Sequence, residues 1–433
     1  MRVLWCSEQP TRPTGYGVVS REFVKRLVER GHEVYVMGWD YHGEDFKHEE
    51  GWTLVHAGSR FGGDPLVGAA TTMDYNLNRL KPDVVFSLAD VWHTDAIVRS
   101  CNRFKVPHVS YLPIDGKDIP RAWTDTLKMT HTPLWMSLHG RSEFNAYIDR
   151  FHSKGTAVEG LRDPFLDRFA QPFFTEVLYH GVDLELFKPV SQAQKDEWRE
   201  ALGLSRWKTV FLSVGRNGNR KQQPRLLEAF KEMLSKVENP DEVGLIMHTG
   251  DPTNMMGLGG WNLPEMVREM GLENNITFSD PSAHPLLGMK REDMAKLFAM
   301  ADCHVLATGG EGFGIPSIEA MACGVPIILP DNTTGPEFIG KGAKTMRGKL
   351  VKNDAEIVGP NGMKMSLVSI KALANALQWM VEHPAKRQGM GNRARKWAEE
   401  RVGWDALTDH LERTLEKASK TPHPHGNNTM VKA

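Results

Sequence analysis

Apolar residues along the chain follow two spacings, and these spacings predict the secondary structure. Short compact apolar runs are typical of buried strands, and apolar residues every three or four positions are typical of helices that bury one face. A strand, a loop, a helix and a further strand in succession form the repeating unit of a parallel sheet. In the first half we expect strands at residues 3–6, 34–37, 54–55, 84–88, 108–112 and 176–179, with helical patterns between them such as residues 18–29.

A second series of the same kind begins at residues 210–214. Further strands are expected at residues 243–248, 276–278, 303–307 and 325–329, and helices at 226–234, 263–270, 294–300, 315–323, 365–380, 385–401 and 404–418. A chain of 433 residues is also too long for one ordinary core. We therefore expect an α/β protein with two doubly wound, Rossmann-like domains that face each other across a cleft.

The expected boundaries follow from the polar crossing segment HGVDLELFKPVSQAQ and from the composition of the last residues. Residues 1–185 form the first domain and residues 186–402 the second. Residues 403–420 form a helix that packs back on the first domain, and the polar tail 421–433 is disordered.

Composition narrows the class of protein only slightly. The formal net charge of -1 and the pI near 7.0 give no overall attraction to nucleic acid or to anionic membranes. No signal-peptide pattern or membrane-length apolar run is visible, so we expect a cytoplasmic protein. The four cysteines are far apart and lie in or beside apolar runs, which favours buried free thiols in a reducing compartment: Cys6, Cys101, Cys303 and Cys323.

The stretch GGEGFGIPSIEAMACGVPIILP, residues 309–330, carries the strongest chemical signal. It reads as a glycine loop, a helix that stops at Gly324, and a buried strand. The N-terminus of a helix offers unpaired N–H groups to an anion, and Glu311 and Glu319 stand on either side of this one. Glu319 has apolar neighbours, so it needs a hydrogen-bonding partner if it is buried. Carboxylates beside an anion site suit a nucleotide sugar; two ordinary exposed glutamates are the alternative.

Two other loops repeat the pattern of a strand, glycines and a helix. In PTRPTGYGVVS, Gly15 and Gly17 allow the backbone to approach a phosphate or a sugar, although any tight turn favours glycine. In FLSVGRNGNRKQQPRLLEAF, Arg216 and Lys221 can clamp a diphosphate, and the adjacent Arg220 can replace either. A solvated basic loop is the alternative for this second segment.

Together these segments resemble a large family of retaining glycosyltransferases of the GT-B type, the family 4-like enzymes called glycosyl transferases group 1. TGYGVVSREFVKRLVERGHEV is similar to the first loop, helix and second strand of that family. HGVDLELFKP is similar to its domain crossing, VGRNGNRKQQPRLLEAF to its phosphate clamp, and EGFGIPSIEAMACGVPII to its paired-glutamate signature. The resemblance implies transfer of a sugar from a nucleoside-diphosphate sugar to an acceptor hydroxyl, with retention of anomeric configuration.

The resemblance also implies roles for single residues. Glu311 would hold sugar hydroxyls together with the N–H groups of Phe313 and Gly314, the Ile315 N–H would meet a phosphate, and Glu319 would hold the ribose. The implied donor-binding set is Gly15, Gly17, Arg216, Lys221, Glu311, Phe313, Gly314, Ile315 and Glu319. Because cations would stabilise the departing diphosphate, no metal and no cofactor besides the donor is required. The chain has no Asp-x-Asp metal motif.

One position departs from the family pattern. Many relatives carry a histidine in the first domain, after a strand, that faces the reacting sugar. Here the strand at residues 108–112 is followed by Pro113, Ile114 and Asp115, so Asp115 is the catalytic candidate at this place. The loop SLADVWHTDA offers Asp90 and His93 instead. The catalytic candidates are therefore Glu311, Asp115, His93, Arg216 and Lys221.

The acceptor stays open at this point. Aromatic and basic residues mix in YLPIDGKDIPRAW, in TPLWMSLHGRSEF and in residues 151–174, and such a surface can stack a base or a sugar ring. NMMGLGGWNLPEM in the second domain is similarly ambiguous. Arg21, Lys25 and Arg26 suggest a weak contact with a membrane surface, or a solvated helix face. A small molecule, a glycolipid or a polysaccharide is the favoured acceptor, and a hydroxylated base in DNA is the alternative acceptor. The alternative function is that of a nucleotide-sugar-binding protein or an epimerase of the same fold.

Overall fold

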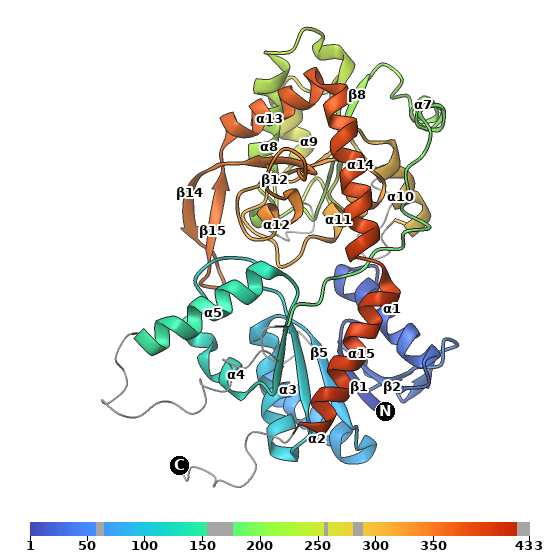
Figure 1. Ribbon diagram of the computed structural model, residues 1–433, viewed down its shortest axis with the longest axis vertical. Helices are drawn as coiled ribbons and strands as arrows, with labels where there is room; N and C mark the ends of the chain where they lie inside the picture. The colour runs from blue at the N-terminus through green and yellow to red at the C-terminus, as the bar shows by residue number, and fades with distance from the viewer. Residues whose placement is uncertain (58–64, 154–175, 255–258, 280–288, 422–433) are drawn as a thin grey trace. The chain divides into compact units, whose positions relative to one another are not determined.

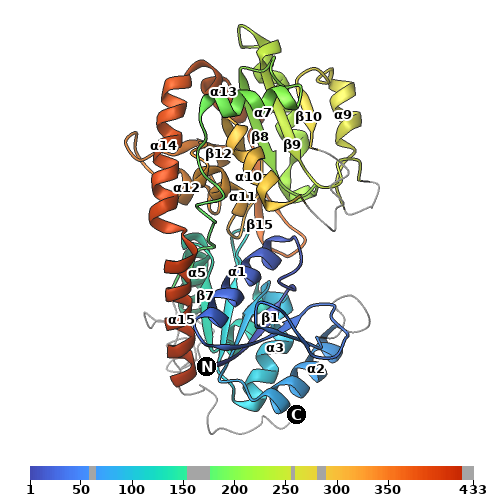
Figure 2. The same cartoon turned by 90° about the vertical axis from the view of Figure 1, so that its right-hand side faces the viewer.

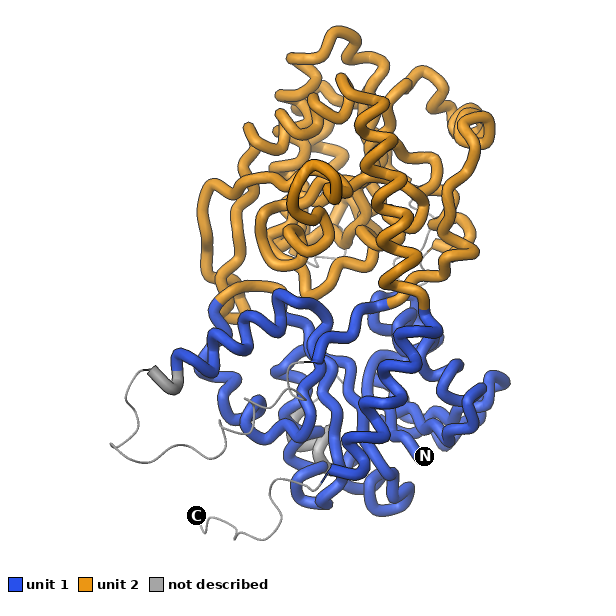
Figure 3. Tube along the Cα trace, viewed as in Figure 1, with its two compact units in different colours: residues 1–114, 118–180, 404–433 blue, residues 115–117, 181–403 orange. Residues whose placement is uncertain are grey.

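The computed structural model describes residues 1–57, 65–153, 176–254, 259–279 and 289–421. The chain forms two compact units, shown in Figure 3: unit 1 comprises residues 1–114, 118–180 and 404–433, and unit 2 comprises residues 115–117 and 181–403. Each helix among the described residues is too short or too polar to cross a bilayer. Residues 154–174 of the expected acceptor segment 151–174, and all but the first residue of the expected disordered tail 421–433, lie outside the described residues.

Unit 1 is built on a seven-stranded sheet with the order β3-β4-β2-β1-β5-β6-β7. The strands pair in parallel except for β3 and β4. Buried residues run continuously along β1, β5 and β6, as expected for strands that are covered on both faces. The strands are β1 (Arg2–Ser7), β2 (Glu33–Gly38), β3 (Phe46–Lys47), β4 (Thr53–Val55), β5 (Val84–Leu88), β6 (His108–Leu112) and β7 (Thr132–Trp135).

The helices of unit 1 include the last helix of the chain. Helix α15 packs against α1 (Figure 1). The rings of Phe23 and Trp404 meet edge to face there with centroids 5.1 Å apart, and Arg30 Nη1 lies 2.9 Å from a carboxylate oxygen of Glu412. The elements are α1 (Gly15–Glu29), α2 (Pro65–Leu80), α3 (Val91–Phe104), η1 (Arg121–Trp123), α4 (Thr124–Met129), α5 (Leu138–Ser153) and α15 (Trp404–Lys420).

Unit 2 has a six-stranded parallel sheet with the order β10-β9-β8-β11-β12-β13, in which β8, β9 and β10 lie side by side in Figure 2. Strands β14 and β15 form a separate antiparallel pair. The strands are β8 (Thr209–Val214), β9 (Val243–His248), β10 (Ile276–Phe278), β11 (Cys303–Val305), β12 (Ile327–Pro330), β13 (Gly348–Val351), β14 (Asn353–Val358) and β15 (Lys364–Val368).

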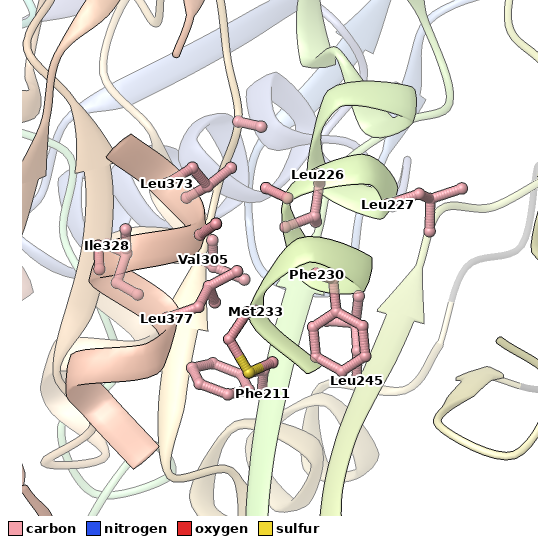
Figure 4. Packing of buried hydrophobic residues seen from close by; sticks show 14 of the residues in the cluster. Phe211, Leu226, Leu227, Phe230, Met233, Leu245, Val305, Ile328, Leu373 and Leu377 are labelled. Carbon is pink, nitrogen blue, oxygen red and sulfur yellow. The ribbon is translucent and has the colours of Figure 1, made fainter. Parts of the chain in front are cut away.

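Helices α8 and α13 pack together over one face of this sheet and close the core of unit 2, as Figure 4 shows. Leu226, Phe230 and Met233 recur at helical spacing on α8, and each is at most 1% exposed. The elements are α7 (Gln192–Ala201), η3 (Asn219–Lys221), α8 (Gln223–Leu234), η4 (Pro240–Glu242), α9 (Leu263–Met270), α10 (Arg291–Met300), α11 (Ile315–Ala322), α12 (Gly335–Ile339), α13 (Ile370–Glu382) and α14 (Pro384–Arg401).

Three local expectations were wrong. Residues 365–368, expected to begin a helix, belong to β15, and α13 starts later because the Ser369 side chain accepts a hydrogen bond from the Ala372 N–H and caps it. Residues 176–179 form a single bridge between Val177 and Trp135 instead of a full strand. Helix α1 begins at Gly15, three residues before the expected start, because the Thr14 side chain caps it. The four cysteines are buried free thiols, as expected.

Candidate functional site

The order of the strands places a candidate site in unit 2. The sheet order reverses between β8 and β11, which are neighbours, and ligands of open parallel sheets bind beyond the carboxyl ends of the strands at such a reversal. Residues 215–222 follow β8 and residues 306–314 follow β11. These are the two segments that carry the expected cations and Glu311.

Glu311 is the centre of an ion-pair cluster on these loops. Its Oε1 lies 2.6 Å from Lys221 Nζ, and its Oε2 lies 3.0 Å from Arg220 Nη1. The Glu311 residue is only 7% exposed. Burial alone would raise the pKa of this carboxyl, but the charges of Arg220 and Lys221 outweigh it and lower the pKa to about 2. Glu311 is therefore held as a carboxylate.

Two opposing effects act on the pKa of Lys221. Burial lowers the pKa of its ammonium group, and the neighbouring Glu311 carboxylate partly offsets that effect. A buried cation of this kind gains from any additional anion that comes within reach. The Arg220 guanidinium also donates to the Gly310 carbonyl, so both cations are anchored to the glycine loop.

Asp115 belongs to this cluster by its position. Its Oδ2 lies 3.6 Å from Arg220 Nε, and its Oδ1 accepts a hydrogen bond of 3.2 Å from Asn361 Nδ2. A Cβ built on Gly310 would collide with the Asp115 carbonyl oxygen, so only glycine allows the two backbones to come this close. Asp115–Lys117 is accordingly grouped with unit 2, although the strand that precedes it lies in unit 1.

The loop that carries Glu311 leads into the N-terminus of α11. The Glu311 N–H donates to Thr333 Oγ1 at 2.9 Å. Gly314 caps the helix with a φ of +101°, a conformation that favours glycine. Ile315 is the first helical residue, so its N–H has no acceptor within the helix. Phe313 is buried against Phe338, with ring centroids 5.2 Å apart.

Glu319 is buried, and its partner in this structure is Arg291 at the start of α10. Burial raises the pKa of Glu319, and Arg291 works in the opposite direction. A ribose was the expected partner of this carboxylate. The sequence did not reveal Arg291, because it lies 28 residues away on another helix.

Arg216 is not drawn into the ion-pair cluster. Its side chain is exposed and makes no hydrogen bond or ion pair with the described residues, while its carbonyl accepts from Gln223 Nε2 at 2.9 Å. The residue that contacts Glu311 together with Lys221 is Arg220, which we had regarded as a substitute. The Arg216 side chain can therefore reach a ligand, but no contact with the described residues fixes its position.

The other predicted residues lie in unit 1. Gly15 and Gly17 are not in a loop but in the first turn of α1. The Gly17 N–H already donates to Thr14 Oγ1 at 3.0 Å, and a Cβ there would collide with the Arg12 carbonyl oxygen. The glycine at position 17 is therefore required by the fold. Gly15 is exposed at the first helical position, where its N–H has no acceptor within the helix.

His93 and Asp90 lie at the start of α3, where His93 Nδ1 is 3.7 Å from Asp90 Oδ2. Tyr16, between the two glycines, donates to Asp90 Oδ1 at 3.3 Å. The structure thus brings the first turn of α1 and the start of α3 together in unit 1. Glu311, Lys221 and Asp115 meet in unit 2.

The three α1 cations considered for a membrane contact each have a carboxylate partner. Arg21 lies 3.5 Å from Glu50, Lys25 lies 4.0 Å from Glu29, and Arg26 lies 2.6 Å from Glu22. Paired cations of this kind add little attraction to an anionic surface. This favours the solvated helix face.

Comparison with solved structures defines the class of fold. HepE from Anabaena in complex with UDP aligns over 96% of this chain and 100% of that chain, with a TM-score of 0.67 and 16% identity. Sucrose-phosphate synthase from Thermosynechococcus elongatus aligns over 96% of this chain and 99% of that chain, with a TM-score of 0.70 and 17% identity. The fold is therefore GT-B, with two Rossmann-like domains, as the sequence predicted.

The second half of the chain matches a known family model. Residues 194–397 match the model described as glycosyl transferases group 1. A D-inositol 3-phosphate glycosyltransferase from Mycobacterium sp. (strain JLS) is 32% identical over 37% of this chain and 32% of its own length. One from Corynebacterium kroppenstedtii is 26% identical over 59% of this chain and 51% of its own length. The chain thus spans about a third to a half of these relatives.

Proposed function

We propose that this protein is a glycosyltransferase that moves a sugar from a nucleoside-diphosphate sugar to an acceptor hydroxyl. The observation that carries the proposal is the pairing of Arg220 and Lys221 with the buried Glu311 carboxylate at the strand-order reversal of unit 2, beside the N-terminus of α11. The match of residues 194–397 to the glycosyl transferases group 1 family model supports it, and so does the UDP bound to the similarly folded HepE.

The charges around the cluster suit a diphosphate. Arg216, Arg220 and Lys221 supply three positive charges, and Glu311 and Asp115 supply two negative ones, which leaves an excess of one positive charge. When a donor enters, its phosphates would take over the cations, and the Glu311 carboxylate would then accept hydrogen bonds from sugar hydroxyls. Glu319 would exchange Arg291 for the ribose hydroxyls.

In the reaction the bond between the anomeric carbon and the distal phosphate oxygen breaks, and the electron pair stays on the diphosphate. The acceptor oxygen forms the new bond to that carbon, and its proton passes to the departing diphosphate oxygen. Because negative charge on the distal phosphate is largest late in the bond breaking, Arg220, Lys221 and the Ile315 N–H would stabilise the transition state more than the bound donor. The proposal includes metal independence, since these groups supply the positive charge. The proposal also includes retention of anomeric configuration, because the segment from Glu311 to Glu319 resembles the paired-glutamate signature of retaining enzymes.

Asp115 is the residue that we place beside the donor sugar, because it is grouped with Arg220 and with the loop of Glu311. Its carboxylate can accept a hydrogen bond from a sugar hydroxyl. His93 is the second candidate for this position. An Asp115→Asn variant that loses release of the nucleoside diphosphate in the absence of acceptor, while His93→Gln keeps it, would favour Asp115, and the opposite result would favour His93.

A panel of nucleotide sugars tests the proposal. UDP and GDP are screened by thermal shift, and UDP-glucose, UDP-galactose and GDP-mannose are scored for release of the nucleoside diphosphate without acceptor. Binding to the folded state alone raises the melting temperature, so the cognate diphosphate should raise that of the wild type and not that of Lys221→Ala. Failure of both diphosphates to raise it, together with no release from any donor, would overturn the proposal.

A further inference from the structure

Aromatic rings gather at the strand-order reversal of unit 1, which lies between β1 and β5. Tyr16 stands on α1 after β1, Trp39 directly follows β2, and Trp92 and His93 stand at the start of α3 after β5. Successive ring centroids are 6.4 Å apart for Tyr16 and Trp39, 5.7 Å for Trp39 and His93, and 5.8 Å for His93 and Trp92. Trp123 continues the row at 5.3 Å from Trp92. We call these five rings the aromatic platform.

The platform differs from the aromatic core of the same unit. Trp5 and Trp135 have no exposed surface, as expected for side chains that only pack. Trp92 is 41% exposed, and Tyr16, Trp39 and His93 are partly exposed, whereas Trp123, the fifth ring, is buried. A ring system that is left open at the carboxyl ends of parallel strands lies where ligands bind in this class of fold.

Hydrogen-bonding groups lie directly beside the exposed rings. The Asp90 carboxylate accepts from the Tyr16 hydroxyl at 3.3 Å and lies 3.7 Å from His93 Nδ1. Asp90 immediately precedes the first residue of α3, so its backbone is fixed by the helix. The platform therefore offers apolar ring faces together with a carboxylate, an imidazole and a phenol.

We infer that the aromatic platform is the acceptor site and that the acceptor presents a pyranose ring there. A pyranose has an apolar C–H face, which packs on an aromatic ring, and a hydroxyl edge, which donates to carboxylates and imidazoles. Trp92 would stack the ring, and Asp90 and His93 would take the hydroxyls. The inference rests on the proposed function and narrows its acceptor to a carbohydrate or glycoside.

A nucleic-acid acceptor fits the platform less well. Rings stack bases as readily as sugars, but nucleic-acid sites surround such rings with cations that follow the phosphates. Here the group held against Tyr16 and His93 is the Asp90 carboxylate, and a second carboxylate, Glu8, accepts from Thr14 at the start of the same helix. Negative charge beside the rings opposes a phosphate backbone.

Saturation-transfer NMR on the full chain tests the inference with three probes: methyl α-D-glucopyranoside, methyl α-D-mannopyranoside and methyl β-D-galactopyranoside. Trp92→Ala is compared with Phe104→Ala, which removes a ring of similar exposure (37%) from the other end of α3. We expect transfer to the ring protons of at least one glycoside, about tenfold weaker binding in Trp92→Ala, and wild-type binding in Phe104→Ala.

Transfer from none of the three glycosides would overturn the inference, and so would an equal loss in both variants. A gel shift with duplex DNA that Trp92→Ala abolishes would overturn it in favour of a nucleic-acid acceptor. Binding of UDP or GDP is measured in parallel on the same samples. Glycoside binding without nucleotide binding would contradict the proposed donor function, whereas nucleotide binding without glycoside binding would contradict only the inference on the acceptor.

Discussion

At the reversal between β8 and β11 in unit 2, Arg220 and Lys221 are paired with the buried Glu311 carboxylate. At the reversal between β1 and β5 in unit 1, the side chains after the strands are mostly aromatic, partly exposed and gathered around one carboxylate. The same position in two sheets of the same class thus carries different chemistry. The contrast fits a division in which unit 2 holds the charged donor and unit 1 holds a neutral, hydroxyl-rich acceptor. Single substitutions in each unit test this division.

The largest effect is expected from Lys221→Ala. Loss of this cation removes stabilisation of the departing diphosphate, and we expect turnover of the cognate donor to fall about 100- to 1000-fold. Lys208→Ala is the control, because Lys208 is a largely exposed lysine that pairs with Glu242 in the same unit. Turnover in Lys221→Ala that equals the control would show that the charged cluster does not act on the donor.

Glu311→Gln should lower the free energy of unfolding by about 3 kcal/mol at pH 7, because two cations lose their buried partner. The folded-state pKa of Glu311 is lowered to about 2 from 4.5, so this stabilisation is present above pH 4.5 and is lost as the pH falls through 2. The difference between wild type and variant should therefore shrink across that range.

Urea unfolding at a series of pH values measures this difference. Glu265→Gln is the matched control, since Glu265 is half-exposed and pairs with Arg268 on its own helix. It should change the free energy of unfolding by less than about 0.5 kcal/mol. A Glu311→Gln variant as stable as this control would contradict the electrostatic description of the cluster.

Gly17→Ala tests whether the fold of unit 1 requires glycine at this position. The added Cβ collides with the Arg12 carbonyl, so we expect a loss of about 2 kcal/mol in the free energy of unfolding. Gly15→Ala, two residues earlier and exposed, should change it by less than about 0.5 kcal/mol. If the two variants were equally stable in thermal unfolding, the fold would not explain Gly17, and contact with a ligand would again be the reason for a glycine there.

Arg216→Ala should have the smallest effect. Its side chain is exposed and has no ion-pair partner among the described residues, so the melting temperature of the free protein should not change. Affinity for the cognate nucleoside diphosphate should fall about tenfold, the value of one charge-assisted hydrogen bond. Calorimetric titration measures it, with Arg268→Ala as the control; unchanged affinity would leave Arg220 and Lys221 as the diphosphate cations.

Most of the fold could be predicted from the sequence because hydrophobic spacing directly reports burial. The two parallel sheets, their main helices and the placement of Glu311 at a helix start all follow from apolar runs and glycines. Hydrophobic spacing gave wrong helix boundaries where a capping side chain sets the first residue of the helix. The Thr14 side chain caps α1, which begins earlier than expected. The Ser369 side chain caps α13, which begins later than expected, and residues 364–368 form β15.

The site could be predicted only in part, because long-range pairing leaves no local pattern. The glutamates and the basic loop were visible, yet the choice of Arg220 over Arg216 depends on the 3₁₀ turn of η3, and Arg291 reaches Glu319 from another helix. The aromatic platform was missed for the same reason, since its rings come from separate loops. A buried carboxylate such as Glu319 does require a cation or a donor, and that requirement was the one available signal.

Titration of the cognate nucleoside diphosphate into the wild type, Lys221→Ala and Trp92→Ala tests the division between donor and acceptor most directly. The diphosphate is whichever of UDP and GDP raises the melting temperature of the wild type. The account predicts that Trp92→Ala binds it as tightly as the wild type and that Lys221→Ala binds it at least about tenfold more weakly. Wild-type affinity in Lys221→Ala, or a comparable loss in Trp92→Ala, would contradict it.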